Sequence, residues 1–231
     1  MKRQSAPRYL GFDTRIEFPT PELAMLLALG HRGRVLELGC GHGTEALFLG
    51  AHGCEVLGID NSRLAIKTAN ERRASGPAIV RRNVSFRCGD ALTYRDTKPG
   101  TYAMVLERLL FQNLFWREGD RRTVGSYARM RARLFAVAAF ALEPGGLFVL
   151  RFRPHQTEMA TWGRMVVPSI RDEDAEVASR YFDFDEANEI GFQGMVTPVA
   201  FESDLLALES MRMSVLIMRR KDTPPPRGRS R

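Results

Sequence analysis

Short runs of apolar residues alternate along this chain with longer stretches in which apolar residues recur every three or four positions. The short runs are typical of buried strands, and the longer stretches are typical of helices. Because the two kinds alternate, the pattern predicts a parallel sheet flanked by helices. The predicted strands are residues 34–38, 55–59, 84–88, 102–107, 147–152, 193–201 and 214–219. The predicted helices are residues 21–30, 44–52, 62–74, 121–142 and 184–190.

This order of elements predicts an α/β fold with a doubly wound, seven-stranded sheet. A length of 231 residues suits one domain of the larger kind. We expect this domain to span residues 19–221, after a lid or arm at 1–18 and before a disordered basic tail at 222–231. Residues 153–182 have a less regular pattern, and we expect an insertion there that caps the substrate. The last two strands are close enough along the chain to be antiparallel neighbours.

Three glycines follow the first predicted strand at every second position, Gly39, Gly41 and Gly43, and a helix pattern begins at Thr44. Glycines let the backbone approach a ligand closely, and the start of a helix adds free N–H groups. The dinucleotide-binding fingerprint has the spacing G-x-G-x-x-G, whereas this turn has G-x-G-x-G. Glu37 also precedes the first glycine by two residues. The turn therefore indicates a ligand other than a dinucleotide pyrophosphate, and a nicotinamide-dependent oxidoreductase is disfavoured.

Asp60 ends the second predicted strand, 17 residues after Gly43. An acid at this place can accept hydrogen bonds from both hydroxyl groups of a ribose. The alternative is a helix-capping role, because Asn61 and Ser62 begin the next helix. After a glycine turn, we favour the ribose.

The run from Arg34 to Thr44 resembles the first motif of class I S-adenosylmethionine-dependent methyltransferases. The resemblance covers about residues 20–221, and it implies a Rossmann-like sheet that ends in an antiparallel hairpin. It also implies S-adenosylmethionine as the cofactor, S-adenosylhomocysteine as the product, and an acid, Asp90, at the adenine amino group. Further runs match the family's motifs in order: residues 88–92, 102–107, 142–150, 184–192 and 214–221. The cofactor-binding residues expected are Glu37, Gly39, Cys40, Gly41, Gly43, Asp60, Asn61, Asp90, Ala91, Leu92 and Glu107.

Within that family, the run that begins at Glu107 and Arg108 is similar to thiopurine and tellurite-resistance methyltransferases, which act on small molecules. Those enzymes usually have Asp-Arg-Gly followed by a histidine and a leucine. Here leucine replaces the glycine, and Gln112 or Asn113 stands near the histidine position. The Asn/Asp-Pro-Pro-Tyr run of enzymes that methylate nucleic-acid bases does not stand at this site, nor does a carboxylate cluster for a metal.

Candidate catalytic residues are Glu107 and His155, the latter as a general base if the acceptor needs deprotonation. Arg108, Arg151 and Arg153 are candidate substrate-binding residues, because arginine binds carboxylates in a bidentate manner. The cluster of Arg151 and Arg153, followed by His155, would suit a small, anionic acceptor, although a solvated loop in an arginine-rich protein explains this whole cluster as well. The expected lid would use three aromatic residues, Tyr9, Phe12 and Phe18, which ordinary packing explains nearly as well.

The net charge of +7 is concentrated at the ends of the chain. Residues 1–8 carry +3 and residues 219–231 carry +5, which leaves −1 for residues 9–218. A nucleic-acid-binding domain normally has a basic face on the fold itself, so a nucleic-acid partner is disfavoured. A nucleic-acid or protein methyltransferase that docks through its basic tails remains an alternative, as does a protein that binds the cofactor without methylating.

Three widely spaced cysteines indicate reduced thiols and a cytoplasmic protein. No apolar run approaches the ~20 residues that a membrane-spanning helix needs. The pattern therefore predicts no membrane segment, and it leaves the oligomeric state open.

Overall fold

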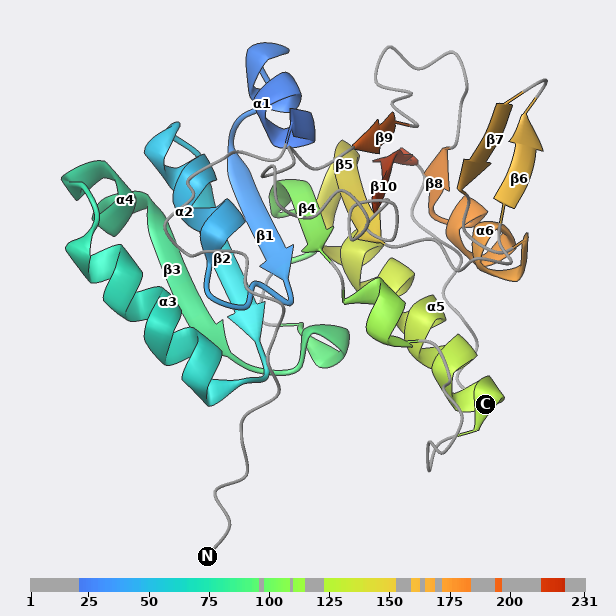
Figure 1. The fold of residues 1–231 in the computed structure, drawn as a ribbon, viewed down its shortest axis with the longest axis horizontal. Coiled ribbons are helices and arrows are strands. Elements are labelled where there is room, and N and C mark those ends of the chain that lie inside the picture. The colour runs from blue at the N-terminus through green and yellow to red at the C-terminus, as the bar shows by residue number, and fades with distance from the viewer. Residues whose placement is uncertain are drawn as a thin grey trace, which may run out of the picture.

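A computed structural model describes residues 21–95, 98–108, 110–114, 123–152, 159–162, 165–168, 172–183, 194–196 and 213–222. Within these residues one large sheet forms the centre of the molecule, with helices on both of its faces (Figure 1). Its strands are β1 (Arg34–Leu38), β2 (Glu55–Asp60), β3 (Val84–Cys88), β4 (Tyr102–Arg108), β5 (Leu142–Phe152), β8 (Phe182–Asp183), β9 (Gly194–Val196) and β10 (Met213–Arg220). A separate hairpin pairs β6 (Met159–Trp162) with β7 (Met165–Pro168).

The strands lie in the order β3-β2-β1-β4-β5-β10-β8, with β9 also paired to β10. The first five are parallel, and β10 is antiparallel to β5. Both β8 and β9 pair in an antiparallel manner with β10, so these two short strands share one position at the edge. The predicted doubly wound sheet with seven positions and an antiparallel C-terminal hairpin is therefore confirmed.

The helices are α1 (Pro21–Ala28), α2 (Thr44–Ala51), α3 (Arg63–Ser75), α4 (Ala78–Asn83), α5 (Val124–Ala141) and α6 (Asp172–Ser179). Two short 3₁₀ helices, η1 (Ala91–Thr93) and η2 (Phe111–Leu114), follow β3 and β4. None of the helices in the described ranges is both long and apolar enough to cross a bilayer.

Two hydrophobic cores lie on opposite faces of the sheet. Successive side chains of a strand point to opposite faces, so Val35 packs with α1 and α2 whereas Leu36 packs with α5, η1 and η2. In the second core, Phe135 contacts Phe111 and Phe148 edge to face, with ring centroids 5.9 Å and 6.2 Å apart. Packing in these two cores fixes the central strands, so that their carboxyl ends lie side by side at one end of the sheet.

Some elements differ from the sequence pattern. Helix α4 was not predicted, because its six residues, Ala78–Asn83, are too few to show an apolar period. Strand β5 begins at Leu142, five residues before the predicted start, and its pairing with β4 shifts between Tyr102 and Met104. That irregular pairing accommodates the Pro144-Gly145-Gly146 run, which reads as a turn in sequence.

The stretch at 153–182, predicted to be irregular, contains both the β6–β7 hairpin and α6. Helix α6 packs against α5 through a buried ion pair between Arg131 and Asp174. The predicted helix at 184–190, the arm at 1–18, and the tail from residue 223 lie outside the described residues, and the predicted cap remains a prediction.

Candidate functional site

The carboxyl ends of β1, β2 and β3 are adjacent in the sheet, and each of them leads to one of the predicted acids. Leu38 of β1 is paired with Ile59 of β2, and Asp60 is paired with Cys88 of β3. The N–H of Gly89 donates to the carbonyl of Asp60, 2.9 Å away, which keeps the two strand ends together. Glu37, Asp60 and Asp90 therefore belong to neighbouring strand ends, as the sequence predicts.

The glycine turn joins the end of β1 to α2, and all three of its glycines have positive φ, at 75° for Gly39, 52° for Gly41 and 76° for Gly43. A side chain at Gly43 would clash, because its Cβ would lie 2.3 Å from Phe86 Cζ. A Cβ at Gly41 would meet no atom of the described residues within 4 Å. Gly43 thus serves close packing, whereas a side chain at Gly41 would meet none of the described residues.

The carboxylate of Asp60 holds the glycine turn. Its Oδ2 accepts from the N–H of Gly41 at 2.9 Å, and its Oδ1 accepts from the N–H of Ser62 at 2.8 Å. The side chain therefore has the capping role that the sequence left open, while Ser62 is the N-cap proper, accepting from the N–H of Ala65 at 3.2 Å. An ionised carboxylate can accept about four hydrogen bonds, so capacity for a ribose remains. The ribose role, and that of the exposed Asn61 beside it, stay predictions.

Asp90 lies exposed at the end of β3, and its Oδ1 accepts from the N–H of Leu92 at 2.9 Å. This contact begins η1 and buries Ala91 and Leu92 in the core next to α5. The carboxylate of Asp90 is exposed, whereas Ala91 and Leu92 are buried. Contact of these residues with adenine stays a prediction.

Glu37 is buried inside the site, with 1% of its surface exposed. Its Oε2 accepts from the N–H of Ala46 at 3.1 Å, which ties β1 to the first turn of α2. Burial raises the pKa of Glu37 well above its usual value, and the neighbouring Glu45 carboxylate raises it further. Glu37 therefore supports the turn from beneath.

Cys40 sits between the glycines with its thiol turned into the protein. Burial, and then the charges of Glu37 and Asp60, raise the pKa of this thiol. A thiol that stays protonated is a poor nucleophile, so Cys40 contributes packing and its backbone groups.

Glu107 ends β4 as a buried carboxyl, 1% exposed, on the face of the sheet that packs against α5. Its Oε1 accepts from the N–H of Phe111 at 2.8 Å, which fixes the start of η2. Burial raises its pKa to about 8, against the opposing effect of the Phe111 and Leu110 N–H groups. The Leu110 side chain then lies over the glycine turn, since a Cβ at Gly39 would be 3.2 Å from Leu110 Cβ. The catalytic role of Glu107 stays a prediction, and the structure assigns it a supporting one.

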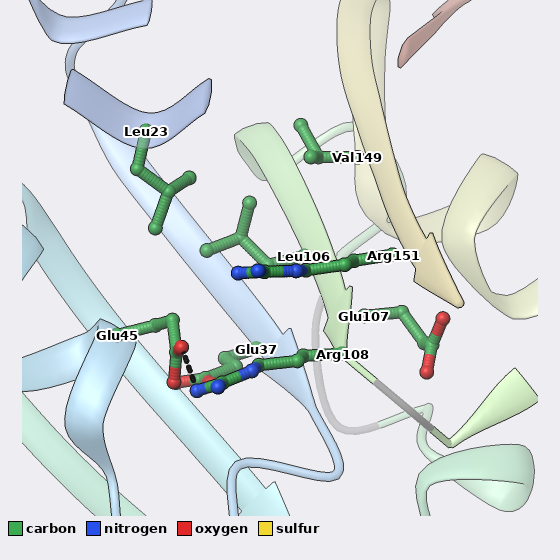
Figure 2. A pocket seen from close by; sticks show the side chains of 8 residues that line it. All are labelled: Leu23, Glu37, Glu45, Leu106, Glu107, Arg108, Val149 and Arg151. Atoms are coloured by element: carbon green, nitrogen blue, oxygen red, sulfur yellow. Dashed lines mark hydrogen bonds and ion pairs between the residues drawn. The ribbon is translucent and has the colours of Figure 1, made fainter. Parts of the chain in front are cut away.

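A second group of charged residues lies on the opposite face, beneath α1 and α2. Figure 2 shows the side chains of Arg108 and Arg151 extending in the same direction, Arg108 to Glu45 and Arg151 over Leu106, while the carboxyl of Glu107 points away from them. Arg108 and Arg151 are register partners on β4 and β5, and Arg108 forms an ion pair with Glu45. The pocket they line is small, and its full lining is Leu23, Glu37, Glu45, Leu106, Glu107, Arg108, Val149 and Arg151.

The sequence pattern did not identify Glu45 or Leu23. The only available signal for Glu45 was an acid in the first turn of a helix, which is common because it complements the helix dipole. Two other predicted residues, Arg153 and His155, lie outside the described residues. The structure therefore places the predicted cofactor residues at or next to adjoining strand ends, and it pairs two of the three predicted substrate arginines, Arg108 and Arg151, in register. Their roles stay predictions.

Comparison with known proteins agrees with this geometry. A model of the methyltransferase domain matches residues 35–146, which run from β1 into β5. The chain is 27% identical over 152 residues to a trans-aconitate 2-methyltransferase of Delftia acidovorans, covering 65% of this chain and 49% of that protein. It thus spans about half the length of that relative.

A second relative, a 2-heptyl-1-hydroxyquinolin-4(1H)-one methyltransferase of Mycobacteroides abscessus, is 27% identical over 189 residues, covering 76% of this chain and 73% of that one. Among solved structures, a glycopeptide N-methyltransferase complexed with S-adenosylhomocysteine has the same fold, with a TM-score of 0.56 at 18% identity, covering 88% of this chain and 90% of that one. The strand order, the glycine turn with its acids and these matches agree, and residues 35–146 of this chain match the methyltransferase domain family.

Proposed function

We propose that this protein transfers the methyl group of S-adenosylmethionine to an oxygen, nitrogen or sulfur atom of a small, anionic molecule. The observation that carries the proposal is the glycine turn at the carboxyl end of β1. Its Gly41 N–H is bound by Asp60, while the space in front of Gly41 is open. Ligands of open α/β sheets bind at the carboxyl ends of the strands.

The residues at these strand ends fit the cofactor. Asp60 would accept hydrogen bonds from the ribose, Asp90 would receive the adenine amino group, and the turn with Gly41 would pass beside the amino-acid part. The cofactor supplies an activated methyl group on a sulfonium. This chain therefore has to align the acceptor with that methyl and exclude water, and positioning of this kind is worth roughly 7–11 kcal/mol.

The need for a base depends on the acceptor. A thiolate or an amine needs little help, whereas an alcohol needs a group that takes up its proton. His155 is our candidate for that group. Glu107, with a pKa raised to about 8, accepts a hydrogen bond from the Phe111 N–H on the face of β4 away from Arg108. We therefore infer that Glu107 maintains the shape of the site.

A small acceptor is supported by the curated relatives, whose names specify trans-aconitate and a hydroxyquinolone. Trans-aconitate is a carboxylate, which agrees with the paired arginines near the carboxyl ends of β4 and β5. The body of the protein carries a net charge of only −1 between residues 9 and 218, which fits a small molecule better than a polyanion.

The test has two steps. First, the purified chain is titrated with S-adenosylmethionine and S-adenosylhomocysteine by calorimetry, with Asp60→Ala as the negative control. Second, it is incubated with S-adenosylmethionine and panels of carboxylates, phenols, amines and thiols, and S-adenosylhomocysteine is measured by mass spectrometry. We expect binding of both nucleosides and acceptor-dependent product. Binding without product from any panel would favour a binding protein, and failure to bind either nucleoside would reject the proposal.

A further inference from the structure

We propose that Arg72 of α3 is a positioning residue, which holds the second half of the glycine turn in the shape that binds the amino-acid part of the cofactor. This inference rests on the proposed function and adds a residue from outside the turn. The Nη1 group of Arg72 donates to the carbonyl of His42 at 2.9 Å and to Oγ1 of Thr44 at 3.0 Å. One guanidinium thus binds the residues on both sides of Gly43.

The first half of the turn, residues 39–41, is held by β2. The N–H groups of Gly39 and Cys40 donate to the carbonyl of Ile59 at 2.8 Å and 2.9 Å. The N–H of Gly41 donates to the carboxylate of Asp60 at 2.9 Å. Strand β2 therefore fixes the turn only as far as its second glycine.

The second half of the turn, residues 42–44, lies against α3. A Cβ at Gly43 would be 3.3 Å from the Cβ of Ala69, so the helix approaches the turn closely at this point. Arg72 follows Ala69 by three residues, which is nearly one helical turn, and it lies on the same side of α3. The helix thus supports the second half of the turn through the contact at Ala69 and the hydrogen bonds of Arg72.

The contacts of Arg72 fix the orientation of one peptide group in the turn. The carbonyl of His42 accepts from Arg72, and the N–H of Gly43 in the same peptide donates to the carbonyl of Cys40 at 2.8 Å. Because a peptide group is planar, two bound ends define its orientation. Gly43 is also the N-cap of α2 and provides no side-chain cap, so the direction of the first N–H groups of α2 depends on the path of this turn.

The experiment uses the full chain and two ligands, S-adenosylhomocysteine and 5′-methylthioadenosine, which has the same nucleoside and sulfur but no amino-acid part. The variants are Arg72→Met, which removes the donors, and Arg72→Lys, which keeps the charge on a side chain without the guanidinium fork. The matched control is Arg73→Met. Arg73 is the next residue of α3, and its Nη1 donates to the carbonyl of Val84 at 2.9 Å, away from the turn.

We expect Arg72→Met to bind S-adenosylhomocysteine about tenfold more weakly than the wild type, as loss of hydrogen bonds from a charged donor predicts. Arg72→Lys should weaken it by a smaller factor. Arg73→Met should bind this ligand within about twofold of the wild type, although it also loses a bond to a backbone carbonyl. Affinity for 5′-methylthioadenosine should stay within about twofold in all three variants, because that ligand does not reach the second half of the turn.

Calorimetry measures the affinities, and urea unfolding shows that each variant is folded under the same conditions. Affinity of Arg72→Met for S-adenosylhomocysteine within about twofold of the wild type would overturn the inference. An equal loss in Arg72→Met and Arg73→Met, or an equal loss for both ligands, would also overturn it, because a general loosening of α3 has that effect. If Arg72→Met does not fold, Arg72→Lys provides the same comparisons.

Binding by the wild type separates this inference from the proposed function. If the wild type does not bind S-adenosylhomocysteine, the proposed function itself fails. If the wild type binds this nucleoside and the Arg72 variants bind it equally well, only the role of Arg72 is wrong.

Discussion

Two glycines of the turn share a left-handed backbone and differ in what surrounds them. Gly43 has φ 76° with Phe86 against it, whereas Gly41 has φ 52° with open space in front of it. A left-handed backbone costs a residue with a side chain roughly 1–2 kcal/mol. Glycine is therefore needed at position 43 for close packing, and we infer that it is needed at position 41 for the approach of a ligand.

We predict that Gly43→Ala lowers the free energy of unfolding by about 1–3 kcal/mol more than Gly41→Ala, because its Cβ overpacks the core. Gly41→Ala should instead reduce affinity for S-adenosylhomocysteine. Urea unfolding and calorimetry of both variants measure the two effects. Equal losses of stability, or unchanged affinity in Gly41→Ala, would contradict this division of roles.

Asp60 combines a structural and a ligand role in one carboxylate. We predict that Asp60→Ala weakens S-adenosylhomocysteine binding at least about tenfold, since charge-assisted hydrogen bonds contribute ~1.5–3 kcal/mol. Removal of the 2′-hydroxyl from the ligand should weaken binding to the wild type but not to the variant.

Calorimetry measures the affinity of the wild type and of Asp60→Ala for S-adenosylhomocysteine and for the same ligand without its 2′-hydroxyl. Together the four affinities form a double-mutant cycle. Glu71→Ala, which changes an exposed acid of α3 paired with Lys67, serves as the control. If Asp60→Ala still discriminates between the ligands, the carboxylate only caps the turn and does not hold the ribose.

Glu107 makes stability depend on pH. Its pKa rises from an ordinary value of 4.5 to about 8 in the folded protein, mainly through burial. Between these two values the folded state binds more protons than the unfolded state, so stability falls as pH rises from about 4.5 to about 8. The contribution is fully present below the lower value and is lost above the upper one.

We predict that Glu107→Gln has a flatter profile of stability against pH than the wild type between about pH 5 and 8, because the amide keeps an acceptor for the Phe111 N–H and cannot ionise. Urea unfolding at several pH values measures it, with Glu71→Gln as the exposed control. An unchanged slope in Glu107→Gln would mean that Glu107 is ionised when folded.

At the scale of elements, one ion pair connects three of them. The Arg131 Nε of α5 donates to both carboxylate oxygens of Asp174 in α6, each at 2.9 Å. Its Nη1 also donates to the carbonyl of Leu114, which ends η2, at 3.1 Å. Because η2 follows Glu107, this pair fixes the segment that lies over the glycine turn.

We predict that Asp174→Ala lowers the free energy of unfolding by about 3–5 kcal/mol, since it removes the carboxylate from a buried guanidinium. The double variant Arg131→Met with Asp174→Leu should recover most of that loss, because an apolar pair avoids the desolvation of both charges. Urea unfolding of the single and double variants measures the coupling.

The exposed pair Arg180–Glu176, at 3.0 Å, provides the matched control. Glu176→Ala should cost less than about 1 kcal/mol, as solvent-exposed pairs do. Similar losses for Asp174→Ala and Glu176→Ala would indicate that the link between α5 and α6 does not hold the fold.

At the scale of the whole molecule, the net positive charge comes from the two ends of the sequence, since residues 9–218 carry a net charge of −1. Removal of residues 223–231 deletes Arg227, Arg229 and Arg231, and the candidate site residues within the described ranges all lie between positions 23 and 151. We predict that this deletion leaves the affinity for S-adenosylhomocysteine and the turnover of a small acceptor unchanged.

Turnover of the full and shortened chains between about 50 and 200 mM salt tests this, because binding of a polyanion weakens steeply over that range. Strong salt dependence that disappears with the deletion would support the alternative of a nucleic-acid or protein acceptor.

Much of the fold follows from the local pattern of residue types along the chain. Strands 34–38 and 84–88 were predicted with the bounds that the structure has, because each is a short run whose ends are marked by a change of composition. The turn at Gly39, Gly41 and Gly43 was likewise visible, since positive φ restricts the choice of residue. Ser62 was predictable as an N-cap for the same kind of local reason.

Other features depend on residues far apart in the chain. Glu45 and Arg108 are separated by 63 residues, and Arg131 and Asp174 by 43. No periodicity indicates such partners, because they meet only when helices pack on the sheet. That Glu107 and Arg108 point to opposite faces follows from the alternation of a strand, but which of these faces packs against α5 depends on the tertiary structure.

The sequence by itself determined the alternation of strands and helices, the glycine turn and the three acids at adjacent strand ends, since these depend on backbone conformation and on a period of two. Only the tertiary structure decided that Asp60 binds the turn and that Arg108 and Arg151 enter one pocket with Glu45. The reason is physical: the burial and pairing of charges depend on which faces of distant elements are packed together.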